Sequence, residues 1–117
     1  MKRPMPTPRS GLGVGVANGI VYAIGGFDSL SLFLATVEAY DPSSDQWSTV
    51  APLPIARRQL GVAVVNGIVY AIGGYAAGID SGSATATVEA FDPSSHTWSA
   101  RAPMPTARAE LSVAVLD

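Results

Sequence analysis

The sequence contains no cysteine and only one histidine, His96. Without cysteine the chain has no disulfide framework, no thiolate metal site and no cysteine nucleophile. A single histidine also excludes a metal site built from several histidines. We therefore expect no metal and no cofactor, and we expect His96, which lies in a polar stretch, to be an exposed turn residue.

Charge is scarce as well. Seven Lys and Arg stand against nine Asp and Glu, which gives a formal net charge of −2, and charged residues make up 14% of the 117 residues. Typical soluble domains hold about 25% charged residues, so the chain is neither a disordered tail nor a heavily solvated helical protein. With Lys2 as its one lysine, it lacks the basic footprint of a nucleic-acid-binding protein. We expect no nucleic-acid partner.

Long apolar runs are missing too. No run approaches the roughly 18 residues that a membrane helix needs, so we expect no membrane partner. The first four residues hold a basic pair with no hydrophobic stretch behind it, and the sequence therefore predicts no secretory signal. The lack of cysteine is compatible with the cytoplasm and with export, which leaves the compartment unknown.

An internal repeat is the main feature that is present. Residues 12–26 and 60–74 are identical at 13 of 15 positions, and residues 35–48 and 86–99 at 11 of 14. A third start follows at residues 104–108. The unit of about 50 residues predicts repeat 1 at about 5–52, repeat 2 at about 53–103 and the start of repeat 3 at about 104–117.

Each unit has the pattern of four short strands. Short apolar runs at 12–17 and 60–65 are followed by Asn-Gly, the strongest short hairpin signal, because a type I′ turn needs positive φ at both central residues. Second strands are expected at 20–24 and 68–72, and third strands at 36–40 and 87–91, each closed by Asp-Pro-Ser-Ser. A fourth strand carries Trp47 or Trp98. No segment has a helical period, and four antiparallel strands in about 50 residues are typical of one propeller blade.

The motifs resemble the kelch repeat. They are Gly-Gly after the second strand, an aromatic-Asp pair with a tryptophan six residues beyond the aspartate, and Pro-x-x-Arg before each unit. The resemblance covers residues 5–117 and implies a β-propeller of five to seven blades, in a family of mostly protein-interaction modules with occasional enzymes. The expected fold class is all-β: a partial propeller of two four-stranded antiparallel blades plus an extra first strand at 111–116.

Residues that recur in both units are expected to build the scaffold. Paired glycines supply positive φ and close backbone approach, and the tryptophans are flat fillers between blades. One base and one acid recur in register, and we expect them to pair, partly buried, within or between blades. These structural residues are Gly25, Gly26, Gly73, Gly74, Trp47, Trp98, Arg9, Arg57, Arg108, Glu38 and Glu89.

Functional residues are expected where the units differ. In an antiparallel meander the variable loops gather on one face, opposite the Asn-Gly and Asp-Pro turns. We call it the loop face: the loops at 27–34 and 75–85 with the strand-entry positions 10–11, 58–59 and 109–110. The candidate ligand-binding residues are Ser10, Arg58, Gln59, Glu110, Phe27 and Tyr75, of which the resemblance nominates Arg58, Gln59 and Glu110.

Two features of this face stay open at this point. Arg58 suits a ligand that bears a carboxylate, or else it is a solvated surface arginine. The apolar residues of the first loop either fold over the blade as core or bury against another chain, since exposed apolar patches mark contact sites. These contact residues are Leu30, Leu32, Phe33 and Leu34.

Three functions follow as hypotheses. The first is a non-catalytic module that binds a protein or peptide partner through the loop face. The second is a sugar epimerase of the sialic acid mutarotase type, for which Glu110 and Arg58 would supply the acid and the arginine. A copper radical oxidase of the same fold is excluded, because it needs cysteine and several histidines. The third is an oligomerising propeller fragment with no separate ligand.

Two blades do not close a ring, so self-association or further sequence is expected. Three copies of a two-blade chain would make six blades, with one first strand redundant in each chain. The other possibility is a piece of a longer single-chain propeller, and the near-identity of the units does not choose between the two.

Overall fold

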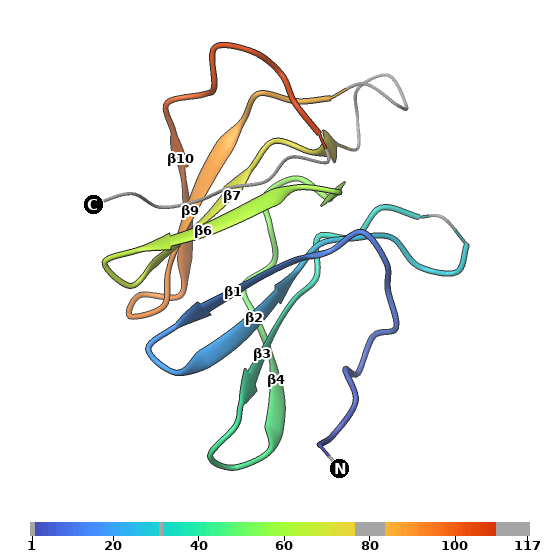
Figure 1. Cartoon of the computed structure of the whole chain (residues 1–117), viewed down its shortest axis with the longest axis vertical. Coiled ribbons are helices and arrows are strands. Elements are labelled where there is room, and N and C mark those ends of the chain that lie inside the picture. The colour runs from blue at the N-terminus through green and yellow to red at the C-terminus, as the bar shows by residue number, and fades with distance from the viewer. Residues whose placement is uncertain (1, 31, 77–83, 110–117) are drawn as a thin grey trace.

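The computed structural model describes residues 2–30, 32–76 and 84–109, which form two large antiparallel sheets (Figure 1) and one short strand pair. Each sheet is a four-stranded meander, and we call the first blade 1 and the second blade 2. Blade 1 consists of β1 (Gly13–Ala17), β2 (Ile20–Ile24), β3 (Val37–Asp41) and β4 (Gln46–Val50). Blade 2 consists of β6 (Gly61–Val65), β7 (Ile68–Ile72), β9 (Val88–Asp92) and β10 (Thr97–Arg101). The all-β prediction is confirmed, and the two sheets do not close a ring.

One strand pair in the structure was not predicted, and one predicted strand lies outside the described residues. A short antiparallel pair joins β5 (Arg57–Arg58) to β8 (Tyr75–Ala76), where the sequence analysis placed only loops. This pair forms because the strand entry of blade 2 and the loop that follows β7 meet at the same edge of the blade. The extra first strand expected at 111–116 lies outside the described residues.

The predicted turns are present in both blades. Asn18 and Gly19 have φ of 53° and 79°, and Asn66 and Gly67 have φ of 50° and 78°, as a type I′ hairpin requires. Both Asn-Gly turns therefore set the register of the first two strands in each blade.

The Asp-Pro turns are held by their aspartates. Asp41 Oδ1 accepts hydrogen bonds from the backbone N–H and the hydroxyl of Ser43, and Asp92 does the same with Ser94. These bonds, the hydroxyl bond first, hold the pKa of Asp41 and of Asp92 below its ordinary value.

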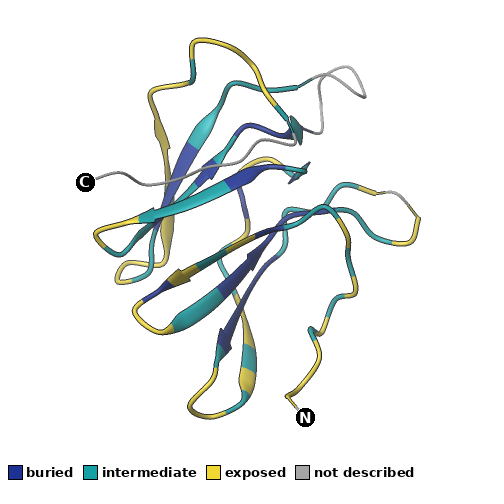
Figure 2. Ribbon diagram, in the orientation of Figure 1, coloured by how far each residue is buried: buried dark blue, intermediate teal, exposed yellow. Residues whose placement is uncertain are grey.

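The core lies between the blades. Gly13 and Gly15 on β1 face blade 2, where a Cβ on Gly15 would lie 2.8 Å from Val62 Cγ1 on β6. Tyr22 of blade 1 meets Phe91 of blade 2 edge to face, with the ring centroids 5.7 Å apart. The buried residues, dark blue in Figure 2, lie mainly on the inner strands of both sheets, β2 and β3 in blade 1 and β7 and β9 in blade 2. Burial of this shared core holds the two blades together.

The chain segment that precedes each blade contacts the fourth strand of that blade in the same way. Trp47 Nε1 donates to the carbonyl of Arg3, and Trp98 Nε1 donates to the carbonyl of Ala51. The two carbonyls are 48 residues apart, as are the repeated strands that they precede. Residues 3–10 therefore belong to blade 1 as residues 51–58 belong to blade 2. Among the described residues, no helix has the length and hydropathy needed to span a membrane.

Candidate functional site

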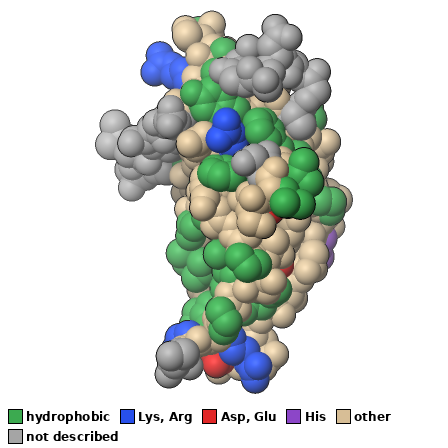
Figure 3. Space-filling model, turned by 90° about the vertical axis from the view of Figure 1, so that its right-hand side faces the viewer, with side chains coloured by type: hydrophobic (Ala, Val, Ile, Leu, Met, Phe, Trp, Pro, Cys, Tyr) green, Lys and Arg blue, Asp and Glu red, His purple; other side chains and the backbone are tan. Residues whose placement is uncertain are grey.

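The loop face lies at one edge of the two blades, and the Asn-Gly and Asp-Pro turns lie at the opposite edge (Figure 1). Figure 3 looks onto the loop face and shows apolar side chains gathered over it, with few acidic groups. Its two strand entries are tied to its two loops by backbone pairing, Ser10 with Phe27 and Arg58 with Tyr75. Four of the six predicted ligand-binding residues are thus paired with one another by the backbone.

Paired glycines allow the chain to cross itself under this face. Gly25 and Gly26 have φ of 67° and 103°, and a Cβ on either would lie 2.5 to 2.6 Å from a carbonyl oxygen, that of Arg57 or of Ser10. The Gly26 N–H donates to the Arg57 carbonyl at 2.8 Å. Side chains at these positions would both strain the backbone and collide with it. Gly73 and Gly74 repeat the arrangement with the carbonyls of Arg108 and Arg58.

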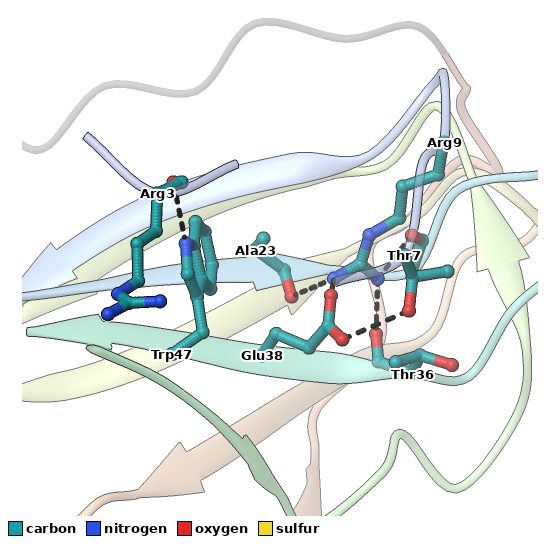
Figure 4. Close-up of polar contacts among 8 residues, drawn as sticks. Arg3, Thr7, Arg9, Ala23, Thr36, Glu38 and Trp47 are labelled. Carbon is teal, nitrogen blue, oxygen red and sulfur yellow. Dashed lines mark hydrogen bonds and ion pairs between the residues drawn. The ribbon is translucent and has the colours of Figure 1, made fainter. Parts of the chain in front are cut away.

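An arginine from the strand entry lies beneath the face in each blade. In blade 1 the Arg9 guanidinium donates to Glu38 at 2.8 Å and to the carbonyls of Ala23 and Thr36, and Thr7 donates to the second oxygen of Glu38 (Figure 4). The side chains of the pair are 0% and 3% exposed. Burial lowers the pKa of Arg9, and the charge of Glu38 and its hydrogen bond oppose that shift.

Blade 2 repeats the pair with Arg57 and Glu89, which are also hydrogen bonded and buried. Burial lowers the pKa of Arg57, and the charge of Glu89 and its hydrogen bond oppose that shift. The pairing predicted from the repeat is present in both blades, within each repeat. Both pairs are enclosed by scaffold and away from the open surface, so they hold the strand entry to the third strand.

The third arginine of the series has a different environment. The backbone of Arg108 is bonded to Gly74 and Thr85 as the backbone of Arg57 is bonded to Gly26 and Leu34. Its side chain is exposed, and it has no acidic partner among residues 2–30, 32–76 and 84–109.

Arg58 is stacked among aromatic rings. Its guanidinium carbon lies 5.1 Å from the ring centroids of Phe27 and of Phe33, and 5.3 Å from that of Tyr75. These distances are those of cation–π contacts. Two of the rings come from the first loop of blade 1 and the third from blade 2, so this stack, which we call the Arg58 cage, bridges the blades. Arg58 is half-buried, and its Nε is buried from solvent. The alternative of a freely solvated surface arginine is therefore wrong.

A pocket of about 480 Å³ lies beside the cage. It is lined by Pro8, Arg9, Ser10, Phe27, Asp28 and Ser29. Phe27 is shared, because its ring faces Arg58 and also lines the pocket. Asp28 Oδ1 accepts hydrogen bonds from the N–H groups of Leu30 and Leu32, both at 3.0 Å, which shapes the loop and places a carboxylate at the pocket wall.

The apolar residues of the first loop divide into two pairs. Leu30 and Leu32 are 76% and 58% exposed, whereas Phe33 and Leu34 are half-buried. Phe33 lies in the Arg58 cage, and the backbone of Leu34 is hydrogen bonded to Gly26 and Arg57. The possibility that all four fold over the blade as core is therefore wrong for the two leucines at the tip. Their burial against another chain stays a prediction.

Two more predicted site residues have distinct outcomes. Gln59 is at the loop face with φ of 52°, in the position where blade 1 has Gly11 with φ of 64°, so a non-glycine residue holds a left-handed conformation there. Glu110 lies outside the described residues. Asp28 is a site residue that was not predicted, although the Asx motif in the loop (Asp-Ser-Leu-Ser-Leu) was a signal for it. The cage was not predicted either, because no spacing rule brings Phe33 to Arg58.

Among the described residues, no group of three or more His, Cys, Asp or Glu is arranged to hold a metal ion. The polar side chains on this face include those of Arg58, Asp28, Ser10 and Gln59, and aromatic rings surround Arg58. Such a surface can bind a flexible polar ligand by stacking and hydrogen bonds.

Comparison with known proteins agrees with the repeat. Residues 8–54 and 56–105 match the family model described as the kelch motif. In the mouse, Mus musculus, the "Influenza virus NS1A-binding protein homolog" is 48% identical over 48 residues. That match covers 41% of this chain and 7% of the relative, so the chain corresponds to a small part of that protein.

Proposed function

Because the chain belongs to the kelch motif family, we propose that it is a non-catalytic module that binds a protein or peptide partner through the loop face. The observation that carries this proposal is the Arg58 cage with the adjoining pocket. The cage holds a positive charge in place between rings, and the pocket offers room of about 480 Å³ next to it. Interaction is the common role of kelch repeats, and the loop face is where the two units differ most.

The chemistry of the face favours a peptide over a small apolar ligand. Arg58 can bind a carboxylate with its terminal nitrogens while its plane rests on the rings. Asp28 across Phe27 carries the opposite charge. Leu30 and Leu32 add exposed apolar area at the rim, which suits a partner that brings apolar side chains. A segment with an acidic and an apolar residue matches these three features.

The similarity to the mouse protein supports a protein ligand, because that relative is named for binding the influenza virus NS1A protein. The epimerase alternative has no observation in its favour. Its arginine is the one stacked in the Arg58 cage, and its acid, Glu110, lies outside the described residues.

A peptide-display selection on the immobilised chain tests the proposal. Enriched peptides are then measured by calorimetry against Arg58→Ala and against His96→Ala, an exposed turn residue at the opposite edge. We expect Arg58→Ala to weaken binding about tenfold or more, since charged contacts contribute about 1.5–3 kcal/mol, and His96→Ala to change it less than twofold. Thermal melting confirms that both variants are folded.

Two results would contradict the proposal. One is that no peptide is enriched over a display on an unrelated protein. The other is that bound peptides are insensitive to Arg58→Ala and are lost with His96→Ala, which would move the binding surface to the turn edge.

A further inference from the structure

The pocket beside the Arg58 cage corresponds to a place that blade 2 fills with its own guanidinium. In blade 2 the backbone of Arg58 pairs with that of Tyr75, and the Arg58 guanidinium carbon lies 5.3 Å from the Tyr75 ring centroid. The equivalent residues of blade 1, 48 positions earlier, are Ser10 and Phe27. The N–H of each donates to the carbonyl of the other, at 3.0 and 2.9 Å. A serine side chain is too short to cover the ring, and both residues line the pocket of about 480 Å³.

Blade 1 also places an acid here that blade 2 lacks. Asp28 is half-buried and lines the pocket, whereas its equivalent in blade 2 is Ala76. The N–H groups of Leu30 and Leu32 hold Asp28 Oδ1 at 3.0 Å, so the carboxylate has a fixed place in the wall. We call this space the Asp28 pocket. It combines an aromatic ring with an acid, and these are the two groups that attract a guanidinium.

The arginines near the Asp28 pocket do not fill this role. Arg9 lines it, but its side chain is 0% exposed and its charge is paired with Glu38 at 2.8 Å. Arg58 contacts Phe27 from blade 2 and carries a like charge. A partner that brings a carboxylate to Arg58 offsets the repulsion between Arg58 and a second cation. Pro8, Ser10 and Ser29 of the pocket are exposed, so a side chain can enter from solvent.

We propose that the Asp28 pocket binds the guanidinium of an arginine side chain on the partner. The Phe27 ring takes this cation as Tyr75 takes that of Arg58, and the Asp28 carboxylate accepts hydrogen bonds from its planar fork. That the guanidinium belongs to a protein or peptide rests on the proposed function. The partner segment then carries an acidic residue for Arg58 and an arginine for the pocket.

A small probe tests the pocket without any peptide. N-acetyl-arginine amide is titrated into the isotope-labelled full chain and followed by NMR, because the guanidinium is its only charge. We expect the amide signals of Ser10, Phe27 and Asp28 to shift. The matched probe is N-acetyl-citrulline amide, which has an uncharged urea of the same shape. It should bind about tenfold more weakly, since it loses both the cation–π contact and the ion pair.

Two variants test the pocket residues with the same probes. Asp28→Asn keeps an oxygen for the two N–H groups of the loop and removes the charge. It should weaken the arginine probe about fivefold or more and leave the citrulline probe unchanged. Ser10→Arg supplies the guanidinium from the chain itself, as Arg58 does in blade 2, and should abolish binding of the arginine probe. Asp92→Asn removes a carboxylate in the turn at the opposite edge and should bind the probe like the parent.

Three results would overturn the proposal. The first is equal binding of the arginine and citrulline probes. The second is an Asp28→Asn chain that binds the arginine probe as the parent does. The third is a Ser10→Arg chain that is folded by circular dichroism and thermal melting and still binds the probe at the same residues.

The Asp28 pocket and the proposed function can fail separately. Selected peptides that depend on Arg58, but bind Asp28→Asn and Ser10→Arg like the parent, would overturn the arginine site and leave the proposed function standing. Binding of the arginine probe that Asp28→Asn weakens, with no peptide enriched in the selection, would support the guanidinium site and contradict the proposed function.

Discussion

The two blades share most of their sequence, yet equivalent residues lie in different surroundings. Val62 and Val64 are half-buried against blade 1, whereas Val14 and Val16 are more than half exposed. Residue type and strand position are the same in both pairs, so the difference comes only from the neighbour that each strand has. In a repeat of this kind, the same strand sequence is buried or exposed according to the blade that packs against it.

The arginine series extends the comparison to three positions. Arg9 and Arg57 are buried on their glutamates, and Arg108 is exposed. Arg9 lies on a segment that packs against blade 1, whereas the backbone of Arg57 is bonded to Gly26 and Leu34 of blade 1 while its side chain enters blade 2. The same ion pair therefore holds one blade together in the first case and two blades in the second.

The largest expected effect comes from removing one acid of these pairs. Glu89→Gln should lower the free energy of unfolding by about 3–5 kcal/mol, because Arg57 is left buried without its counter-charge. Glu38→Gln should cost less, about 1–3 kcal/mol, because the segment that carries Arg9 can move away from blade 1 and hydrate it. Urea denaturation of both variants measures the difference.

The test is whether Glu89→Gln lowers the free energy of unfolding more than Glu38→Gln does. Asp92→Asn in the exposed turn controls for the loss of a carboxylate as such. Equal losses for Glu38→Gln and Glu89→Gln would mean that the two pairs are independent of the contact between the blades.

Most of the scaffold could be predicted from the repeat. Asn18-Gly19 favours a type I′ turn through its own backbone preferences, and the positions of β1 and β2 follow from the short apolar runs on either side of that turn. The ion pairs could be predicted because an acid and a base recurred in register. These features depend on local geometry or on the repeat itself, and both are visible in one sequence.

The site could be predicted only in part. The topology placed Arg58, Phe27 and Tyr75 on one face, but not the stacking of Phe33 on Arg58, since a loop conformation depends on backbone bonds such as those that Asp28 makes. The short strands β5 and β8 were missed for the same reason. Two-residue pairings arise from the approach of distant segments and leave no periodic signal.

A medium effect is expected where the two first strands differ. Gly15→Ala gives β1 the residue that β6 has at position 63, and its Cβ would lie 2.8 Å from Val62 Cγ1. We expect a loss of about 1–3 kcal/mol from overpacking, reduced by the lower entropy of alanine in the unfolded chain. Chemical denaturation measures it.

A double-mutant cycle sharpens this result. Adding Val62→Ala to Gly15→Ala removes the colliding methyl groups, so the second substitution should cost less in the presence of the first. If the two losses simply add, then Gly15 does not serve to make room for Val62, and the difference between glycine on β1 and alanine on β6 has another cause.

The smallest effect concerns a pair that only blade 1 has. The Tyr40 hydroxyl donates to Asp45 Oδ1 at 2.6 Å, whereas blade 2 has Phe91 and His96 at these positions, with the rings 6.5 Å apart. The hydrogen bond to Asp45 is the main cause that raises the pKa of Tyr40 to about 12, and it holds the pKa of Asp45 below its ordinary 3.8.

The two shifts predict a stability contribution with limits at both ends of the pH scale. The raised pKa of Tyr40 gives a contribution that is present below pH 10 and is lost between pH 10 and about 12. The lowered pKa of Asp45 gives one that is present above pH 3.8 and is lost as the pH falls through that lowered value. Tyr40→Phe, which gives blade 1 the residue of blade 2, should therefore differ from the parent by a constant amount from pH 5 to 9.

Below pH 4 and above pH 10 the difference between parent and Tyr40→Phe should shrink, with at most about one proton linked to unfolding at each end. Asp45→Asn should give the same profile, and the double variant should add nothing to either end, because the two groups act as one hydrogen bond. Unfolding free energies measured across this range decide the point. A difference that stays flat at both extremes would show that the hydroxyl of Tyr40 contributes independently of the charge of Asp45, and that the two blades differ here in shape and not in charge.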